Sequence, residues 1–346
     1  MNLSQLSVVC WMTQGYFRFF LGAFAPILAG FFDVSVASPK DTASGVFALL
    51  EVDTTNRPIK NLPVRTCWTN PNIAGVVLRT DWATVEQAQD QFDWSFLDTG
   101  LELALAHNKK VIVSVDAGTS SPSWIYSLGA QQFTLTTYGV MPCPWDPVFQ
   151  YRWSRFWIQF AERYDSNPQL ICVTLTGPGR TVEYFFAQTI ADAKELQQSV
   201  GTQGWIDAAN YNTDTFVDAL LTTPVFCATG VPVIWHGAVA MTSVADYGLA
   251  KYPAQFGIQS NELTAISFSN GTFPHTTLQA IGLSPMGFQM LQTVASGKLL
   301  GTLQQALNNG ISVGAHFIEV YDMDCEDPNQ QSVIASANLQ LTTAYP

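Results

Sequence analysis

The stretch GVVLRTDWATVEQAQDQFDWSFLDTGLELALAHNKKVIVSVDAGTSSPSWI, residues 75–125, decides the fold. It begins with an apolar run at 75–82, and a second run, rich in β-branched residues, follows at 110–118. Between the runs, over 94–108, apolar side chains recur every three or four residues: Phe96, Leu97, Leu101, Ala104 and Leu105. This spacing predicts a helix with one buried face. A strand, a helix and a strand in this order predict two parallel strands joined by a helical crossover.

The same alternation continues along the rest of the chain. Apolar runs that read as strands lie at 45–53, 75–82, 110–118, 170–177, 231–237, 256–263, 286–291 and 314–321. The clearest helices are expected at 94–108, 146–165, 189–199, 213–222, 243–252 and 297–309. Eight strands with helices between them favour a closed barrel over an open doubly wound sheet. We therefore predict an α/β fold, a single (β/α)8 TIM barrel that forms one catalytic domain over 38–346.

Several motifs that would indicate other chemistry are missing from the sequence. A dinucleotide-binding sheet needs GxGxxG after its first strand, where this chain has Asp53-Thr54-Thr55-Asn56. The sequence also has no phosphate-loop GxxxxGK[ST], no GxSxG nucleophile elbow, no CxxC pair and no histidines at metal-ligand spacing. We therefore expect an enzyme that uses neither a cofactor nor a metal.

The composition bears on the class of ligand. Of the 346 residues 47% are hydrophobic and 12% charged, which is enough apolar surface to exclude a disordered chain. The formal net charge of −12 would repel phosphate groups, so we expect no nucleic-acid partner. Surfaces poor in charge, in a chain with 10 Trp, 11 Tyr and 22 Phe, suit neutral polyhydroxylated ligands that stack on rings and form neutral hydrogen bonds. A carbohydrate fits this description.

The N-terminal segment, 1–37, reads as a signal peptide or an N-terminal apolar anchor. The run FFLGAFAPILAGFF at 19–32 has no charge and follows Arg18, but it is short for a membrane span. Ser35-Val36-Ala37 has the small residues of a signal-peptidase site. We expect cleavage near Ser38 and a secreted or extracytoplasmic protein. An uncleaved anchor, which would make the membrane a stable partner, and a folded helix are the alternatives.

Cys67 and Cys325 follow the first and last predicted strands, which are neighbours in a closed barrel. A disulfide between them would fasten the seam of the barrel. Cys143 and Cys227 are also expected in loops and offer other pairings.

Polar side chains gather at the carboxyl ends of the predicted strands, where barrels of this kind carry their sites. They are Glu51, Asp53, Arg79, Asp81, Asp116, Glu183, His236, Asn261, Glu262, Gln289, Glu319 and Asp322. Because charged residues are scarce in this chain, this gathering indicates a functional site. Trp82, Trp124, Trp145 and Trp235 lie on or just after strand ends, where their indole faces can stack on sugar rings.

Residues 75–125 resemble the second and third β/α units of the large glycoside hydrolase clan built on (β/α)8 barrels, in the style of its β-galactosidase-like members. Those members carry a strand with Arg, then Trp, then the pattern x-E-x-x-x-G-x-F-D-W-S-x-L-D, then a helix and a K-V-I-V strand. The residues that match in order are Arg79, Trp82, Glu86, Phe92, Asp93, Trp94 and Leu97. The glycine of the pattern is replaced by Gln91 or its neighbour.

The resemblance implies hydrolysis by two carboxylic acids, one of which protonates the leaving oxygen while the other attacks the sugar or activates water. The clan has its acid/base just after strand four, normally in an Asn-Glu pair. Here Glu183 follows that strand in the sequence Arg180-Thr181-Val182-Glu183-Tyr184, without the asparagine. The resemblance therefore implies that Glu183 is the acid/base and that Arg79 steadies the second carboxylate.

The second carboxylate departs from the pattern of the clan, which has it at the end of strand seven. That strand, 286–291, reads MGFQML and has no acid. Glu319 on strand eight and Glu262 on strand six are the replacements. We favour Glu319, because strand alternation puts it on one face with Phe317 and Tyr321, directed into the barrel.

We thus expect a glycoside hydrolase-like enzyme that cleaves a neutral carbohydrate with Glu183 and Glu319. Residues expected to bind the substrate are Arg79, Asp81, Trp82, Asp116, Trp124, His236, Asn261, Glu262, Gln289 and Tyr321. The alternative is a carbohydrate-binding TIM barrel that has lost a competent acid pair and catalyses nothing.

Overall fold

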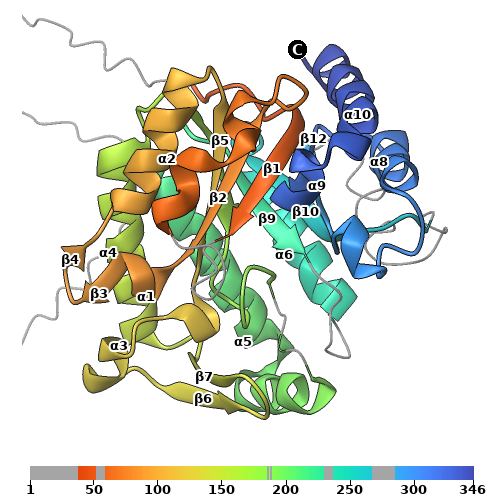
Figure 1. Ribbon diagram of the computed structural model, residues 1–346. Helices are drawn as coiled ribbons and strands as arrows, with labels where there is room; N and C mark the ends of the chain where they lie inside the picture. Colours follow the sequence, from red (N-terminus) through yellow and green to blue (C-terminus); the bar gives the residue numbers. More distant parts are fainter. Residues whose placement is uncertain (1–37, 52–58, 185–186, 188, 230–236, 267–284) are drawn as a thin grey trace, which may run out of the picture. The chain divides into compact units, whose positions relative to one another are not determined.

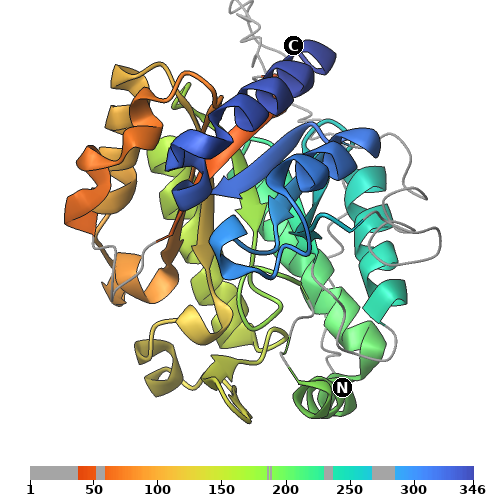
Figure 2. The same ribbon diagram turned by 45° about the vertical axis from the view of Figure 1, so that its right-hand side comes forward.

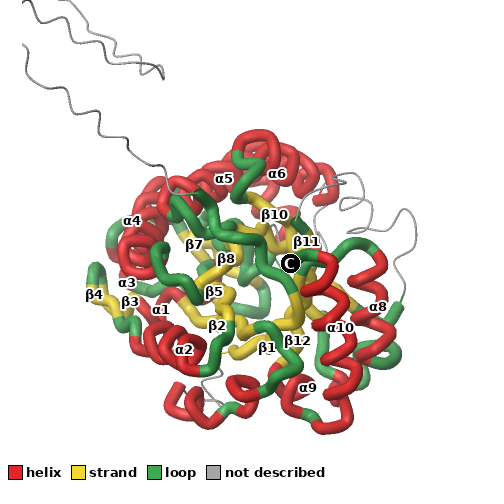
Figure 3. Tube along the Cα trace, turned by 90° about the horizontal axis from the view of Figure 1, so that it is seen from above, coloured by secondary structure: helices red, strands yellow, loops and turns green. Residues whose placement is uncertain are grey.

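The computed structural model describes residues 38–51, 59–184, 187, 189–229, 237–266 and 285–346. Its centre is a closed barrel of eight parallel strands (Figures 1 and 3). In chain order the strands are β1 (Gly45–Glu51), β2 (Gly75–Asp81), β5 (Lys110–Asp116), β8 (Leu170–Leu175), β9 (Val225–Thr229), β10 (Phe256–Leu263), β11 (Met286–Met290) and β12 (Phe317–Tyr321). β12 pairs with β1 and closes the ring. The predicted (β/α)8 barrel is confirmed.

Helices surround the strands, as the view along the barrel in Figure 3 shows. The longer ones are α2 (Ser95–Ala106), α4 (Pro147–Tyr164), α5 (Ile190–Ala219), α6 (Gly237–Lys251), α8 (Leu303–Ser312) and α10 (Gln331–Ala344). Short helices are α1 (Trp82–Val85), α3 (Trp124–Ser127) and α9 (Asp322–Glu326), with 3-10 turns η1 (Ile59–Val64), η2 (Thr66–Thr69), η3 (Gly118–Ser120), η4 (Val294–Ser296) and η5 (Pro328–Gln330). Two small hairpins, β3 (Glu86–Ala88) with β4 (Gln91–Phe92) and β6 (Gln132–Leu135) with β7 (Gly139–Pro142), extend the loops after β2 and β5. None of the helices in the described part of the chain has the length and apolar character needed to span a bilayer.

The fifth barrel strand differs from the prediction. It is β9, which pairs with β8 through Val173 and with β10 through Phe256, both opposite Val225. Of the predicted run 231–237, residues 231–236 lie outside the described residues, and Gly237 is the first residue of α6. VFCAT and VPVIW are successive apolar runs with strand-forming residues, so the pattern alone does not rank them.

Two predicted helices, 189–199 and 213–222, belong to the single long element α5. Gly201 interrupts it with a φ of 76°, a left-handed conformation that glycine adopts without strain. α10 was not among the predicted helices. It lies along β1, where the Asn338 side-chain oxygen accepts a hydrogen bond from the Val46 amide at 2.9 Å (Figure 2).

The core has two layers that follow from the alternation of the strands. Outward-facing residues such as Val46, Ala48, Ile318 and Val320 pack against the helices. Inside the barrel an apolar cluster contains Ala43, Phe47, Leu49, Val77, Ile112, Cys172, Phe226 and Phe317. A Cβ atom at Gly287 would overlap the ring of Phe317, so glycine is needed there to admit the ring. This apolar packing forms the floor on which the polar site rests.

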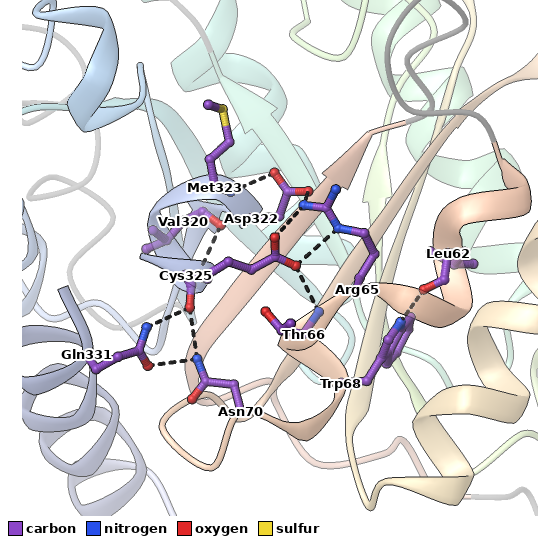
Figure 4. Close-up of polar contacts among 11 residues, drawn as sticks. Leu62, Arg65, Thr66, Trp68, Asn70, Val320, Asp322, Met323, Cys325 and Gln331 are labelled. Atoms are coloured by element: carbon purple, nitrogen blue, oxygen red, sulfur yellow. Dashed lines mark hydrogen bonds and ion pairs between the residues drawn. The ribbon is translucent and has the colours of Figure 1, made fainter. Parts of the chain in front are cut away.

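A polar cluster fastens the seam between the first and last parts of the barrel (Figure 4). The guanidinium group of Arg65, just before η2, donates to both carboxylate oxygens of Glu326 at 3.1 and 2.8 Å and also pairs with Asp322. The carbonyl oxygen of Cys325 accepts hydrogen bonds from Asn70 at 2.9 Å and Gln331 at 2.8 Å.

The predicted disulfide between Cys67 and Cys325 is not formed. All five described cysteines are free and buried: Cys67, Cys143, Cys172, Cys227 and Cys325. Burial raises the pKa of the Cys67 thiol to about 12. Hydrogen bonds and ion pairs therefore fasten the seam instead.

Candidate active site

A cavity of about 300 Å³ opens among the carboxyl ends of the barrel strands. Its wall is formed by Arg79, Thr80, Asp81, Asp116, Thr181, Val182, Glu183, Asn261, Gln289, Leu291 and Tyr321. These residues come from the ends of β2, β5, β10, β11 and β12 and from the loop after β8. Seven of the predicted site residues thus meet in one wall: Arg79, Asp81, Asp116, Glu183, Asn261, Gln289 and Tyr321.

Glu183 is half-buried in this wall and is held by both of its carboxylate oxygens. Oε2 accepts a hydrogen bond from the Thr181 hydroxyl at 3.0 Å, and Oε1 accepts one from the Asn261 side-chain amide at 3.1 Å. The adjacent Tyr184 amide donates to the Ala228 carbonyl at 3.1 Å, which ties the loop to β9. The guanidinium group of Arg180 lies 4.0 Å from the ring centroid of Tyr138.

Glu319 faces the barrel interior, as its alternation with Phe317 and Tyr321 predicts. Its side chain has no exposed surface, and it is not part of the cavity wall. Oε1 accepts a hydrogen bond from Gln259 at 3.1 Å, and Oε2 lies 3.8 Å from Nη2 of Arg79. In this position the carboxylate of Glu319 does not face the cavity.

Gln289, at the end of strand seven of the barrel, does reach the cavity. It stands opposite Glu319 in the register of β11 and β12. The side-chain oxygen of Gln289 accepts a hydrogen bond from Nη2 of Arg79, the same nitrogen that pairs with Glu319. Arg79 therefore joins an amide in the wall to a carboxylate that has no exposed surface.

Asp81 and Asp116 contribute two further carboxylates to the wall. They face each other in the register of the neighbouring strands β2 and β5. The Ser114 hydroxyl donates to Oδ1 of Asp116 at 3.3 Å. Together with Glu183 they give the cavity three acidic side chains.

Of the two tryptophans predicted to bind the substrate, Trp82 belongs to the core, and Trp124 is partly buried and packs against that core. Trp82 has no exposed surface and packs at 4.8 Å between ring centroids against Trp153 of α4. Its indole donates to the Glu86 carboxylate at 2.7 Å, while Trp124 donates to the Glu86 carbonyl oxygen at 3.0 Å. Burial raises the pKa of Glu86, and the hydrogen bond from Trp82 opposes that shift. The aromatic residues of α4 pack against Trp82, and Trp124 packs against Trp82, and neither tryptophan is part of the cavity wall.

Another predicted residue, Glu262, is not brought to the wall. It is the penultimate residue of β10, but its neighbour Asn261 takes the inward position, so Glu262 is half-buried outside the wall. His236 lies outside the described residues, as do the side chains of Glu51 and Asp53. Among the described residues no group of three or more His, Cys, Asp or Glu side chains is arranged to hold a metal ion.

Sequence reasoning missed Thr181 and Gln259. Thr181 is only two residues before Glu183, where a hydroxyl can reach the carboxylate. Gln259 stands two residues before Asn261 on the same strand, so a period of two places both side chains on one face. That period was the available signal for Gln259.

Comparison with known proteins agrees on the fold. No family model and no curated protein sequence matches the chain. Among solved structures, the catalytic domain of β-amylase from Paenibacillus polymyxa aligns with a TM-score of 0.60 and 13% identity, over 88% of this chain and 100% of that one. This chain shares the (β/α)8 fold of that β-amylase domain.

Two β-galactosidases also share this fold. The enzyme from the psychrophilic Marinomonas ef1 aligns with a TM-score of 0.57 and 10% identity over 87% of this chain, and the cold-adapted enzyme from Rahnella sp. R3 with 0.55 and 10% over 89%. The chain spans 60% and 57% of their respective lengths.

Proposed function

We propose that this protein hydrolyses glycosidic bonds of a neutral carbohydrate bound in the cavity, with Glu183 as the acid/base. The observation that carries the proposal is the meeting of Asp81, Asp116 and Glu183 in one cavity at the carboxyl end of a barrel with this fold. Active sites of (β/α)8 enzymes lie at this end. Glycoside hydrolysis needs a proton donor and a second carboxylate that both face the substrate.

Glu183 suits the role of proton donor. Hydrogen bonds to each oxygen, from Thr181 and Asn261, fix the plane of its carboxyl group. A proton donor must be held within hydrogen-bond distance of the leaving oxygen. The half-buried position of Glu183 in the wall allows that approach.

We assign the second carboxylate to the wall, where Asp81 and Asp116 are available, and not to Glu319. A group that attacks the sugar or activates water must touch the substrate or that water. Asp116 is 8% exposed and lines the cavity, whereas Glu319 has no exposed surface. Azide rescue of Asp81→Ala, Asp116→Ala and Glu319→Ala separates these residues. Rescue with a glycosyl azide product only in Glu319→Ala would overturn this assignment.

A second candidate function is carbohydrate binding without catalysis. It is favoured by Gln289, an amide where the resemblance expects an acid, and by the burial of Glu319 beneath the wall. In that case the polar wall would orient a sugar through hydrogen bonds, and the three acids would serve as acceptors.

The experiment that separates the two functions is the substitution Glu183→Gln. Glutamine keeps the shape and the acceptor oxygen but cannot deliver a proton, so turnover of unactivated glycosides should fall by about 10²–10⁴-fold. Nitrophenyl glycosides should lose less, because their leaving groups need little protonation. The measurement is kcat for both substrate types, with sugar binding followed by calorimetry.

Glu102→Gln, which changes an exposed carboxylate on α2, is the matched control and should leave both rates unchanged. Turnover of unactivated glycosides that survives intact in Glu183→Gln would remove Glu183 from the reaction. Binding without turnover in the unmodified protein would establish the second candidate function.

A further inference from the structure

Two side chains, those of Gln259 and Asn261, connect the buried carboxylate of Glu319 with Glu183 in the cavity wall. Nε2 of Gln259 donates to Oε1 of Glu319 at 3.1 Å and to Oδ1 of Asn261 at 3.0 Å. Nδ2 of Asn261 then donates to Oε1 of Glu183 at 3.1 Å. We call the series Glu319, Gln259, Asn261 and Glu183 the amide relay.

Each step of the amide relay fixes the direction of the next. An ionised carboxylate only accepts hydrogen bonds, so Glu319 requires the NH2 group of Gln259 to face it. That NH2 group has two hydrogens, and the second one meets the oxygen of Asn261. With its oxygen engaged, Asn261 presents its own NH2 group to Glu183. Turning either amide over would set oxygen against oxygen inside the barrel.

The surroundings make this direction costly to reverse. Glu319 and Gln259 have no exposed surface, and Asn261 is 3% exposed. When a polar group buried to this degree lacks a hydrogen bond, the folded state is destabilised, because water does not replace the missing partner. The positively charged guanidinium group of Arg79 lies near Glu319, with Nη2 3.8 Å from Oε2. A nearby positive charge favours the ionised form of a carboxylate, which only accepts hydrogen bonds.

We propose that Asn261 is a positioning residue for Glu183 and that Glu319, acting through Gln259, sets the direction in which the Asn261 amide faces. This assignment gives the buried Glu319 a role that needs no contact with substrate. Its catalytic consequence rests on the proposed function, since it assumes that Glu183 transfers a proton. The direction of the amides themselves does not depend on that function.

Two variants remove the relay without changing any charge. Asn261→Leu deletes the donor to Glu183, and Gln259→Met deletes the group that orients Asn261, both with little change in side-chain size. Poor positioning of a catalytic group costs up to about 10²-fold in rate. We expect kcat on an alkyl glycoside to fall by about tenfold to a hundredfold, kcat on the nitrophenyl glycoside of the same sugar to fall much less, and KM to change little.

Ser114→Ala is the matched control, because it removes another buried hydrogen bond to a carboxylate of the wall but lies outside the relay. Any loss in this variant should be equal for the two glycosides. An equal loss for the two glycosides in Asn261→Leu as well would overturn the proposal, since a merely structural defect does not depend on the leaving group.

A measurement without catalysis tests the direction of the amides separately. Hydrogen exchange of the Asn261 side-chain NH2 group, followed by NMR, should be about tenfold faster in Gln259→Met and in Glu319→Gln than in the unmodified protein, and unchanged in Ser114→Ala. If exchange is equal in all four proteins, the relay is overturned. If exchange behaves as expected while no glycoside is hydrolysed, the relay stands and the proposed function fails.

Discussion

The carboxylate of Glu183 accepts hydrogen bonds from one residue of its own loop, which follows β8, and from one residue of β10. β9 lies between these two strands in the barrel. Thr181 is close in sequence, whereas Asn261 is 78 residues away and arrives through the closure of the barrel. The proposed acid/base therefore depends on local sequence for one hydrogen bond and on the whole topology for the other. Its position could be predicted from the rule that sites follow strand ends, but its partner on β10 could not.

Tryptophans show the limit of that rule at the residue scale. Trp82 follows β2 directly and is directed into the aromatic packing of α4, while Asp81, one residue earlier, lines the cavity. A charged side chain at a strand end usually faces the cavity or solvent, because burying an unpaired charge is costly. An indole is stabilised by apolar packing in either direction, so its position in sequence does not decide where it points.

His316 gives a prediction at the residue scale that concerns stability and pH. Burial lowers the pKa of its imidazole, which stacks on Tyr345, and Nδ1 accepts a hydrogen bond from the Met286 amide at 3.3 Å. The unfolded chain, with an ordinary histidine pKa of about 6.5, therefore binds a proton first as the pH falls. This contribution is present above about pH 6.5 and is lost as the pH falls toward the lowered pKa of the folded protein.

The free energy of unfolding, measured with urea at about pH 7.5 and at about pH 5, should fall on acidification, and the fall should be smaller in His316→Gln. Glutamine retains an acceptor but takes up no proton. His107→Gln changes an exposed histidine and should leave the fall as it is in the unmodified protein. An identical fall in all three proteins would show that His316 does not contribute.

At the scale of elements, most strand positions could be predicted from the sequence, but the choice between two adjacent candidate runs for the fifth strand could not. The run at 256–263 is β10 with the same bounds as predicted. The fifth strand was predicted at the wrong run because two similar apolar runs follow each other in the sequence. Only the pairing of β9 with β8 and β10 distinguishes them. Pairing partners are a property of the barrel that no single run contains.

The seam between η2 and α9 gives a prediction at this scale. Arg65→Gln removes the guanidinium group from Asp322, whose side chain is only 2% exposed, and from Glu326. A buried carboxylate would then remain without the positive charge that faces it, which should cost about 3 kcal/mol of the free energy of unfolding. Urea denaturation measures the loss.

Arg163→Gln is the matched control for the seam. Its ion pair with Asp98 has the same two-nitrogen geometry, but the two side chains are 48% and 33% exposed. Exposed pairs contribute about 0–1 kcal/mol, so this variant should stay close to the unmodified protein. Equal losses in the two arginine variants would contradict the importance given to the seam.

At the scale of the whole molecule, the barrel divides its interior into an apolar floor and a polar mouth. Phe47, Phe226 and Phe317 fill the floor, with ring centroids 5.0 Å apart for Phe226 and Phe317. Glu319 lies between this floor and the cavity wall, where it accepts a hydrogen bond from Gln259 and forms an ion pair with Arg79. The alternation of side chains along β12 predicts that this strand contributes to both the apolar floor and the polar mouth, since Phe317, Glu319 and Tyr321 share one face.

The predicted leader gives a test at this scale, and we propose that it exports the protein. The described chain begins at Ser38, and Lys40 Nζ donates to the carbonyl oxygens of Asn167 and Leu170 and to the Thr223 hydroxyl at 2.8–2.9 Å. A chain beginning at Ser38 keeps these three hydrogen bonds, so it should have a higher Tm than one beginning at Thr42, which loses them. N-terminal sequencing of protein exported by its native host should find Ser38 or a residue next to it. Retention of residues 13–30 there would contradict the cleavage.

The central claim is that the cavity around Glu183 hydrolyses glycosides. The most direct test incubates the protein with a panel of neutral oligosaccharides in ¹⁸O-labelled water and reads new reducing ends by mass spectrometry. Hydrolysis puts an oxygen from water on the anomeric carbon in either of the two carboxylate mechanisms. We predict labelled reducing ends with the unmodified protein and none above background with Glu183→Gln. Binding of a sugar from the panel with no labelled product from the unmodified protein would contradict the account.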